Sequence, residues 1–275
     1  MIDRGMIETG IFVVPSRVCL IGNPTDGYRG RGISACTANH HAIVTVARGG
    51  PDGGVLELQG TVRSLKGDLL ELAGLPVEDG GIRLLQVRRV FATWIWNGCD
   101  ESRPQAACAA FAGHCRERGV QLPPTHSFRA SYETTIPRGV GLSGSSALVT
   151  GMIRALCWAY GVEMGPLELP RVARAAEVDH LGNTAGWGDF VVQSLGGLLL
   201  MDYTRQQGGH LGDFRPLDPA LLPARVWLVW SRVPKPLASG LVHLPVRERF
   251  DRGDPEAVRC AGCFQAAAAA AARLR

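Results

Sequence analysis

The chain has 275 residues, of which 46% are hydrophobic and 20% charged, a composition typical of a globular protein with one large core or two smaller ones. The net charge of +4 comes from basic residues scattered singly along the chain, so we expect no nucleic-acid partner. The sequence contains neither a signal-peptide pattern nor a run of about 18 uncharged apolar residues, so we expect no membrane segment and a cytoplasmic location.

The eight cysteines fit the same compartment. Cys260 and Cys263 alone have CxxC spacing, and one such pair without a second is a weak indication of a zinc or redox site. We therefore expect thiols in a reducing environment rather than a disulfide framework.

The first hundred residues are dominated by strand patterns. Residues 11–14 and 17–21 are short apolar runs separated by Pro15, which predicts two strands, because proline interrupts a ladder or is confined to a sheet edge. Runs rich in β-branched and aromatic residues predict further strands at 33–46, 55–62 and 84–96. Trp94 and Trp96 could flank an adenine, although core packing is the commoner role of tryptophan.

The loop at 22–32 separates the second of these strands from the third. It is dense in turn-forming residues, and it also contains Asn23, Asp26 and Tyr28. Such side chains hydrogen-bond sugar hydroxyls as readily as they stabilise turns, so the loop is either a plain turn or a ligand-binding loop.

From residue 106 onward, helical and strand patterns alternate. Alanine-rich spacing predicts a helix at 106–118 that ends at Gly119, and a one-faced strand follows at 127–134. The later predictions, in chain order, are helices at 145–160 and 171–181, a long loop at 183–189, a strand at 196–202, a linker at 216–223, a new sheet from 225–230 and a helical tail at 254–275.

The segment at 136–147 predicts a glycine-rich turn leading into a helix. Gly139, Gly141 and Gly144 permit positive φ and let another group approach the main chain closely. The N–H groups and the positive dipole end of the following helix favour a phosphate at this point. Ser145 and Ser146 can cap the helix or bind a metal that accompanies the phosphates, and the alternative is a plain loop with a serine cap.

Other readings of this segment fit less well. Its glycines spell GxGxxG, but the strand before it alternates like an antiparallel strand, which disfavours a dinucleotide site. The GxSxG pattern of serine hydrolases cannot be placed on it. Lysine occurs only at Lys66 and Lys235, so a P-loop GxxxxGK[ST] is missing as well.

Taken together, the segments 17–28, 137–147 and 177–197 resemble the GHMP family of small-molecule kinases, and the Asn-Pro-Thr-Asp form of the first most resembles glucuronokinase-like members. The resemblance implies an α+β fold with a GHMP kinase-like two-domain architecture. The first domain would be a ribosomal protein S5 domain 2-like N-terminal domain at 1–215. The second would be a ferredoxin-like C-terminal domain at 224–275, expected to be incomplete because the family's third, glycine-rich motif is absent.

The resemblance also implies roles for individual residues. Asp189 would orient or deprotonate the attacking hydroxyl, with Arg17 beside it, and Ser146 and Glu177 would bind Mg²⁺. The sugar would contact Asn23, Asp26 and Tyr28. The phosphates of ATP would be held by Pro137, Gly139, Gly141, Leu142, Ser143, Gly144, Ser145, Ser146 and Ala147.

Physical chemistry supports part of this assignment. Arg17 lies inside an apolar strand, where an unpaired charge is costly, so we expect a partner such as Asp189 or a phosphate. Taken alone, Glu177 could instead be a helix residue paired with Arg174, and Asp189 a loop cap.

The function implied by the resemblance is ATP-dependent phosphorylation of a sugar or sugar acid at its anomeric hydroxyl, with glucuronate as the favoured acceptor. A sugar acid needs a cationic partner, for which Arg29 and Arg31 are candidates. The alternative is a catalytically inactive nucleotide- or sugar-binding homologue that lacks the third motif. Oligomeric state is left open.

Overall fold

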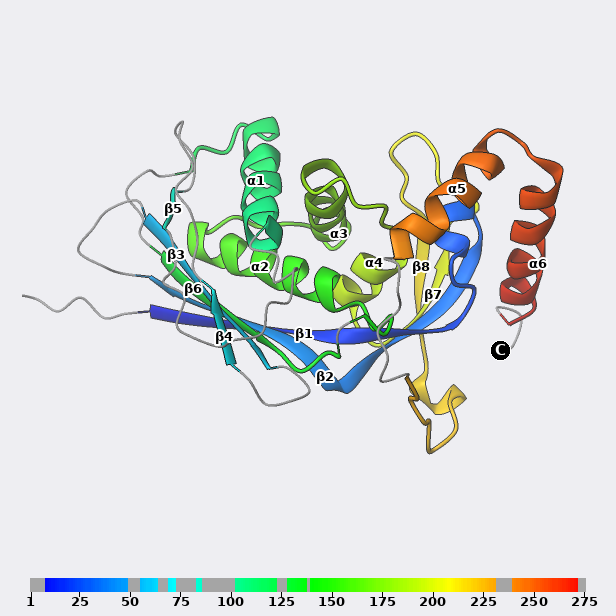
Figure 1. Ribbon diagram of the computed structural model, residues 1–275, viewed down its shortest axis with the longest axis horizontal. Coiled ribbons are helices and arrows are strands. Elements are labelled where there is room, and N and C mark those ends of the chain that lie inside the picture. The colour runs from blue at the N-terminus through cyan, green and yellow to red at the C-terminus, as the bar shows by residue number, and fades with distance from the viewer. Residues whose placement is uncertain are drawn as a thin grey trace, which may run out of the picture.

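The computed structural model describes residues 8–48, 55–63, 69–72, 83–85, 102–122, 128–137, 139–230 and 239–271. These residues form an α+β fold in which helices lie on one face of a mixed sheet (Figure 1). Trp94 and Trp96, considered above for an adenine site, fall outside the described residues.

The sheet has the strand order β4-β3-β6-β2-β7-β8, with β1 paired to β2 and β5 paired to β3. Most neighbours are antiparallel, whereas β3 runs parallel to both β5 and β6. The strands are β1 (Glu8–Ile21), β2 (Arg31–Arg48), β3 (Val55–Arg63), β4 (Leu69–Leu72), β5 (Arg83–Leu85), β6 (Phe128–Thr134), β7 (Leu198–Asp202) and β8 (Asp213–Leu217).

The long strand β2 organises the sheet. One edge of β2 pairs with β1, and the other edge pairs with β6 near its end and with β7 near its start. The register places Arg17 opposite Cys36 and Ile33 opposite Leu200. Because β2 spans both halves of the sheet, it joins residues near 130 to residues near 200.

The two strands predicted at 11–14 and 17–21 are one strand, β1. Pro15 does not end it, because in the described residues β1 pairs only with β2 and proline is tolerated on such an edge strand. The register shifts between Pro15 and Ser16, so the strand bends at this point, and Val14 and Ser16 are both fully buried beside the bend.

Helices cover one face of the sheet, and their bounds are α1 (Ser102–Glu117), α2 (Gly144–Tyr160), α3 (Glu168–Ala175), α4 (Gly188–Leu195), α5 (Ser239–Asp251) and α6 (Pro255–Ala271). Short turns of other helix types are η1 (Thr25–Tyr28), η2 (Ala176–His180) and η3 (Pro219–Leu221). The central helix α2 packs on β1 and β2. Gly151 allows this close approach, since an added Cβ would lie 2.9 Å from Val44 Cγ2.

The main core lies between α1, α2, α3 and the sheet, and it includes Phe111, Met152, Ile153, Leu156 and Phe190, all nearly inaccessible. The predicted helices at 106–118 and 145–160 are confirmed as α1 and α2. The helix predicted at 171–181 starts earlier, at Glu168, and ends in the π-helical turn η2.

Two sequence-based predictions after residue 182 are wrong. The loop predicted at 183–189 is shorter, because α4 begins at Gly188 and contains Asp189 in its first turn. Residues 225–230 form no strand, and Trp227 and Val229 are 83% and 87% exposed. Residues 226–230 are a continuous apolar run like that of a buried strand, but no neighbouring strand pairs with them among the described residues.

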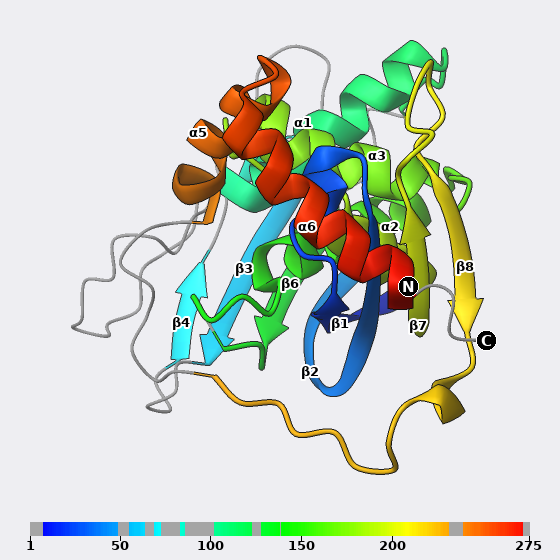
Figure 2. The same ribbon diagram turned by 90° about the vertical axis from the view of Figure 1, so that its right-hand side faces the viewer.

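The last two helices lie at the end of the sheet where β1 and β2 meet η1. In Figure 2, α6 crosses in front of these strands, and it contacts β1, β2 and η1. None of the helices in the described ranges is long and apolar enough to cross a membrane.

Candidate active site

The glycine-rich loop turns sharply before α2. Gly139 and Gly141 have φ values of 72° and 83°, and Ser143 also adopts the left-handed conformation, with φ 60°. Positive φ is costly for serine and free for glycine, which explains the glycine pattern of this segment. The loop therefore ends at the N-terminus of α2, where free N–H groups and the helix dipole favour an anion.

The residues after the turn are less accessible than the glycines. Gly139 and Gly141 are exposed, whereas Leu142, Ser146 and Ala147 are buried. The Ser146 hydroxyl donates a hydrogen bond to the Ser143 carbonyl oxygen at 3.1 Å. The remaining residues assigned to the phosphates, Pro137, Gly144 and Ser145, lie in the same segment, so the structure brings the whole predicted set together.

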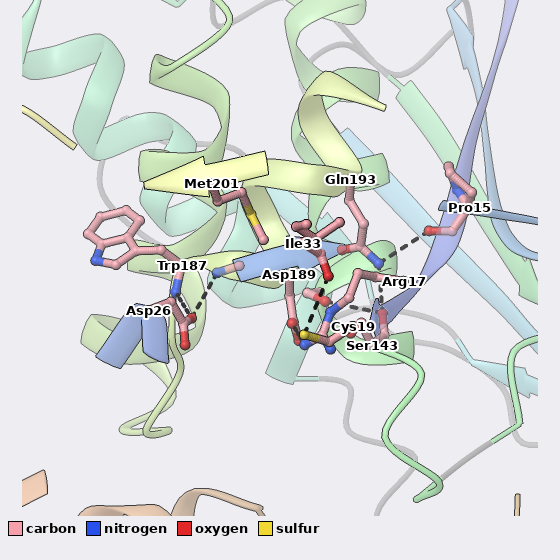
Figure 3. Close-up of polar contacts among 12 residues, drawn as sticks. Pro15, Arg17, Cys19, Asp26, Ile33, Ser143, Trp187, Asp189, Gln193 and Met201 are labelled. Carbon is pink, nitrogen blue, oxygen red and sulfur yellow. Dashed lines mark hydrogen bonds and ion pairs between the residues drawn. The ribbon is translucent and has the colours of Figure 1, made fainter. Parts of the chain in front are cut away.

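Arg17 and Asp189 form an ion pair beside this loop (Figure 3). Their side chains are 12% and 32% exposed, and the Arg17 backbone N–H donates to the Leu142 carbonyl at 3.3 Å. Burial lowers the pKa of the Arg17 guanidinium, and the nearby Cys19 and Asp26 oppose that shift. Of the two partners expected for Arg17, a phosphate or Asp189, the structure shows the ion pair with Asp189.

Gln193 is a site residue that the sequence did not indicate. It lies one turn after Asp189 on α4, so the two side chains share a helix face. The buried Gln193 amide donates to Ser143 O at 2.9 Å and to Pro15 O at 3.2 Å (Figure 3). Gln193 thus joins the glycine-rich loop to β1. Its spacing from Asp189 was the available signal, and it was missed because α4 was not predicted.

The first loop reaches the site through Asp26. Asp26 Oδ2 accepts hydrogen bonds from the backbone N–H groups of Trp187 at 2.7 Å and Gly188 at 2.9 Å. Asn23 is exposed. Tyr28 is 5% exposed, and its ring packs edge-on against Phe250 with ring centroids 5.0 Å apart. The phenol of Tyr28 therefore packs beneath α5.

Glu177 is buried in η2 and is 4% exposed. Its Oε2 accepts a hydrogen bond from Asn183 Nδ2 at 2.8 Å, and its Oε1 lies 3.7 Å from Arg103 Nε. Oε1 accepts no hydrogen bond from the described residues. The sequence-based alternative paired Glu177 with Arg174, whereas in the structure the arginine near Glu177 is Arg103.

Arg174 instead holds the segment before α4. Its Nε donates to Ala185 O at 2.9 Å, and its guanidinium lies 4.3 Å from the centroid of the Trp187 ring. Burial lowers the pKa of Arg174, opposed by Asp179 and Asp26. Among the residues that the structure describes, no group of three or more His, Cys, Asp or Glu side chains could hold a metal by itself.

Comparison with known proteins agrees with this arrangement. Residues 106–197 match the model of the GHMP kinases N terminal domain. The chain is 32% identical over 250 residues to "Glucuronokinase 1" of Arabidopsis thaliana, covering 87% of this chain and 61% of that protein. It is 33% identical over 262 residues to "Probable glucuronokinase 2" of the same plant, covering 92% of this chain and 63% of that protein. The chain thus spans about three fifths of the length of these curated relatives.

The fold is also shared with a solved structure. The mevalonate kinase of Methanococcus jannaschii matches with a TM-score of 0.52 at 19% identity, covering 78% of this chain and 57% of that one. The α+β fold is therefore that of the GHMP kinases. Residues 106–197, the part that matches the GHMP kinase N-terminal domain model, carry most of α1, the glycine-rich loop, α2, α3 and α4.

Proposed function

We propose that the protein is an ATP-dependent sugar kinase that phosphorylates the anomeric hydroxyl of a sugar acid, with glucuronate as the favoured acceptor. The observation that carries the proposal is the ion pair of Arg17 and Asp189 directly beside the glycine-rich loop. The similarity to glucuronokinases supports the choice of acceptor.

In this proposal, the loop residues 137–147 and the N-terminus of α2 bind the phosphates of ATP. Backbone N–H groups suit this role because they are fixed in position and need no reorganisation as charge develops on the phosphoryl oxygens. Gln193 and the Arg17 backbone N–H keep the loop in place through Ser143 O and Leu142 O.

Asp189 and Arg17 act at the acceptor side. Phosphoryl transfer requires an acceptor oxygen in line with the leaving group and positive charge near the transferred group. Asp189 would accept the proton of the sugar hydroxyl, and Arg17 would stabilise the negative charge of the phosphoryl group. Arg17 also holds the Asp189 carboxylate in place through the ion pair between them.

Ser146 and Glu177 are the candidate ligands for Mg²⁺. The fit rests on hard oxygen donors, and Mg²⁺ commonly uses one or two protein oxygens together with substrate phosphates. Glu177 Oε1 is buried, accepts no hydrogen bond from the described residues and lies 3.7 Å from Arg103 Nε, so a metal bound here would share the carboxylate with Arg103. When bound, the metal would neutralise charge on the nucleotide oxygens.

Asn23, Asp26 and Tyr28 are proposed to line the sugar site. Asp26 uses Oδ2 for the α4 backbone, which leaves Oδ1 for a sugar hydroxyl. Of the two arginines considered for the sugar carboxylate, Arg31 pairs with Asp202 at 2.6 Å, so the exposed Arg29 is the better candidate.

The test is turnover with ATP, Mg²⁺ and a panel of glucuronate, galacturonate, glucose and galactose, with ADP release as the measurement. We expect the highest kcat/KM with glucuronate and a product phosphorylated at C1 by phosphorus NMR. The methyl glycoside of glucuronate is the matched control, because its anomeric oxygen is blocked. Failure of every sugar to release ADP while ATP still binds would refute the proposal.

A further inference from the structure

The helix that carries Asp189 has no cap from its own segment. The residue before α4, Trp187, has φ −96° and makes no side-chain capping hydrogen bond. The first N–H groups of a helix lack intrahelical partners, and a helix of eight residues is marginal without tertiary support. The position of Asp189 therefore depends on what holds the start of α4.

Asp26 supplies the missing cap from the first loop. Its Oδ2 accepts from Trp187 N and Gly188 N, 161 and 162 residues further along the chain (Figure 3). A carboxylate here also interacts favourably with the helix dipole. One aspartate thus combines the capping hydrogen bonds and the charge that the N-terminus of α4 requires.

The neighbouring residues leave room for this contact. A Cβ on Gly186 would overlap Asp26 Oδ2, and a Cβ on Gly188 would lie 3.4 Å from the same atom. On the other side, Arg174 holds Ala185 O and covers the Trp187 ring. The backbone at 185–188 is therefore fixed between Arg174 and Asp26.

We propose that Asp26 is a positioning residue: by capping α4 it holds Asp189 on Arg17, so that the sugar loop and the catalytic base form one unit. The inference rests on the proposed kinase function. Besides contacting the sugar, Asp26 would act through Asp189, and the hydrogen bonds that position Asp189 are present before any sugar binds.

Four variants separate this role from a direct sugar contact. Asp26→Ala removes the cap and the carboxylate together, whereas Asp26→Asn keeps an oxygen that can accept both N–H groups. Gly186→Ala keeps the carboxylate group but displaces it from the cap, because the added Cβ would overlap Oδ2 and lie 3.2 Å from Oδ1. The φ of Gly186 lies outside the left-handed region, so alanine is compatible with the backbone. Gly113→Ala in α1 is the matched control, because nothing lies within 4 Å of its added Cβ.

We expect Asp26→Ala and Gly186→Ala each to lower kcat about 100-fold, the loss that misplacement of a reacting group can cause. The KM for ATP should stay unchanged, because the phosphate loop is held by other contacts. The double variant should be no worse than Asp26→Ala, since both changes break the same cap. Asp26→Asn should recover most of the activity, and Gly113→Ala should match the wild type.

Hydrogen exchange of the α4 amides gives a readout independent of turnover. Asp26→Ala and Gly186→Ala should speed exchange at 188–195, and Asp26→Asn should restore protection. The inference would be overturned if kcat fell in Asp26→Ala but stayed at the wild-type value in Gly186→Ala. It would also be overturned if the α4 amides of these variants exchanged faster while kcat did not fall. If the wild type phosphorylates no sugar, the proposed function fails, and unchanged exchange in Asp26→Ala would still overturn the cap.

Discussion

Two helices of this protein are capped by aspartate in opposite ways. α6 receives its cap from the adjoining Asp254, whose Oδ1 accepts from Glu256 N at 3.1 Å and Ala257 N at 3.0 Å. α4 receives its cap from Asp26, more than 160 residues away in the sequence. The local cap needs only its own segment, whereas the remote cap exists only once the chain has folded.

The two helices also differ in how much of their surface is buried against the rest of the protein. α4 is short, and Phe190, Val191, Val192 and Gln193 are all buried. α6 is alanine-rich, and its first turn carries exposed ion pairs with Arg249. Alanine favours helix formation without tertiary contacts, and exposed ion pairs contribute little to stability. Asp189, the proposed base, thus lies on the one of these two helices that depends more on distant residues.

The largest effect is expected for Asp189→Asn. The amide cannot accept the proton of the sugar hydroxyl, so kcat should fall by about 1000-fold, within the range of general base catalysis. ATP affinity by calorimetry should remain close to the wild-type value, because the change lies at the acceptor side. An equal loss of ATP affinity would contradict the role assigned to Asp189.

Gln193→Leu should have the next largest effect. The substitution removes the donor that Pro15 O and Ser143 O share. Because Ser143 O also accepts from Ser146 Oγ and Ala147 N, the free energy of unfolding should fall by about 1 kcal/mol in urea titrations. The glycine-rich loop should also bind ATP less tightly, which calorimetry would detect. Gln193→Glu distinguishes packing from hydrogen bonding, because it keeps the shape but cannot donate when ionised. Wild-type ATP affinity in both variants would show that Gln193 does not hold the loop.

Asp254→Ala tests the local cap against the remote one. Hydrogen exchange of the amides in the first turn of α6 should become faster, because they lose their cap. The kcat should stay unchanged, because the hydrogen bonds of this cap involve no residue of the candidate site. Asp26→Ala under the same conditions should affect α4 and kcat together. A loss of turnover in Asp254→Ala comparable to that in Asp26→Ala would remove the distinction between the two helices.

The smallest effect is expected for thiol alkylation. Cys260 and Cys263 on α6 are exposed, and alkylation there at pH 8 should leave turnover unchanged. Burial raises the pKa of the Cys108 thiol in α1 to about 12, and the reactive thiolate is present only near or above the pKa, so Cys108 should stay unmodified until the chain unfolds. Peptide mass spectrometry would show the order, and early labelling of Cys108 would contradict the packing of α1.

Some of the candidate site could be read from individual residues. Gly139 and Gly141 are local requirements of a sharp turn, whereas Gly144 is the first residue of α2, and the spacing of apolar residues that follows predicts that helix. Arg17 lies in an apolar strand pattern, which predicts burial, and a buried guanidinium needs a negatively charged partner because it loses its hydration.

Other features could not be read in this way. The strand break expected at Pro15 failed because only the sheet shows that the residue lies on an edge strand. The strand expected at 225–230 failed because a short apolar run is compatible with a strand but does not supply a pairing partner, and no described strand pairs with it. The hydrogen bonds of Gln193 could not be predicted from its spacing to Asp189, since its partners are carbonyls of residues 15 and 143.

By itself, the sequence determined the glycine-rich turn, the helix after it, most strands and the need of Arg17 for a negatively charged partner, because these follow from backbone sterics, side-chain periodicity and the cost of burying a charge. Only the tertiary structure decided that Asp26 hydrogen-bonds the start of α4 and that Gln193 hydrogen-bonds the glycine-rich loop. The reason is that a hydrogen bond between distant segments depends on the path of the whole chain, and no local pattern of residues encodes that path.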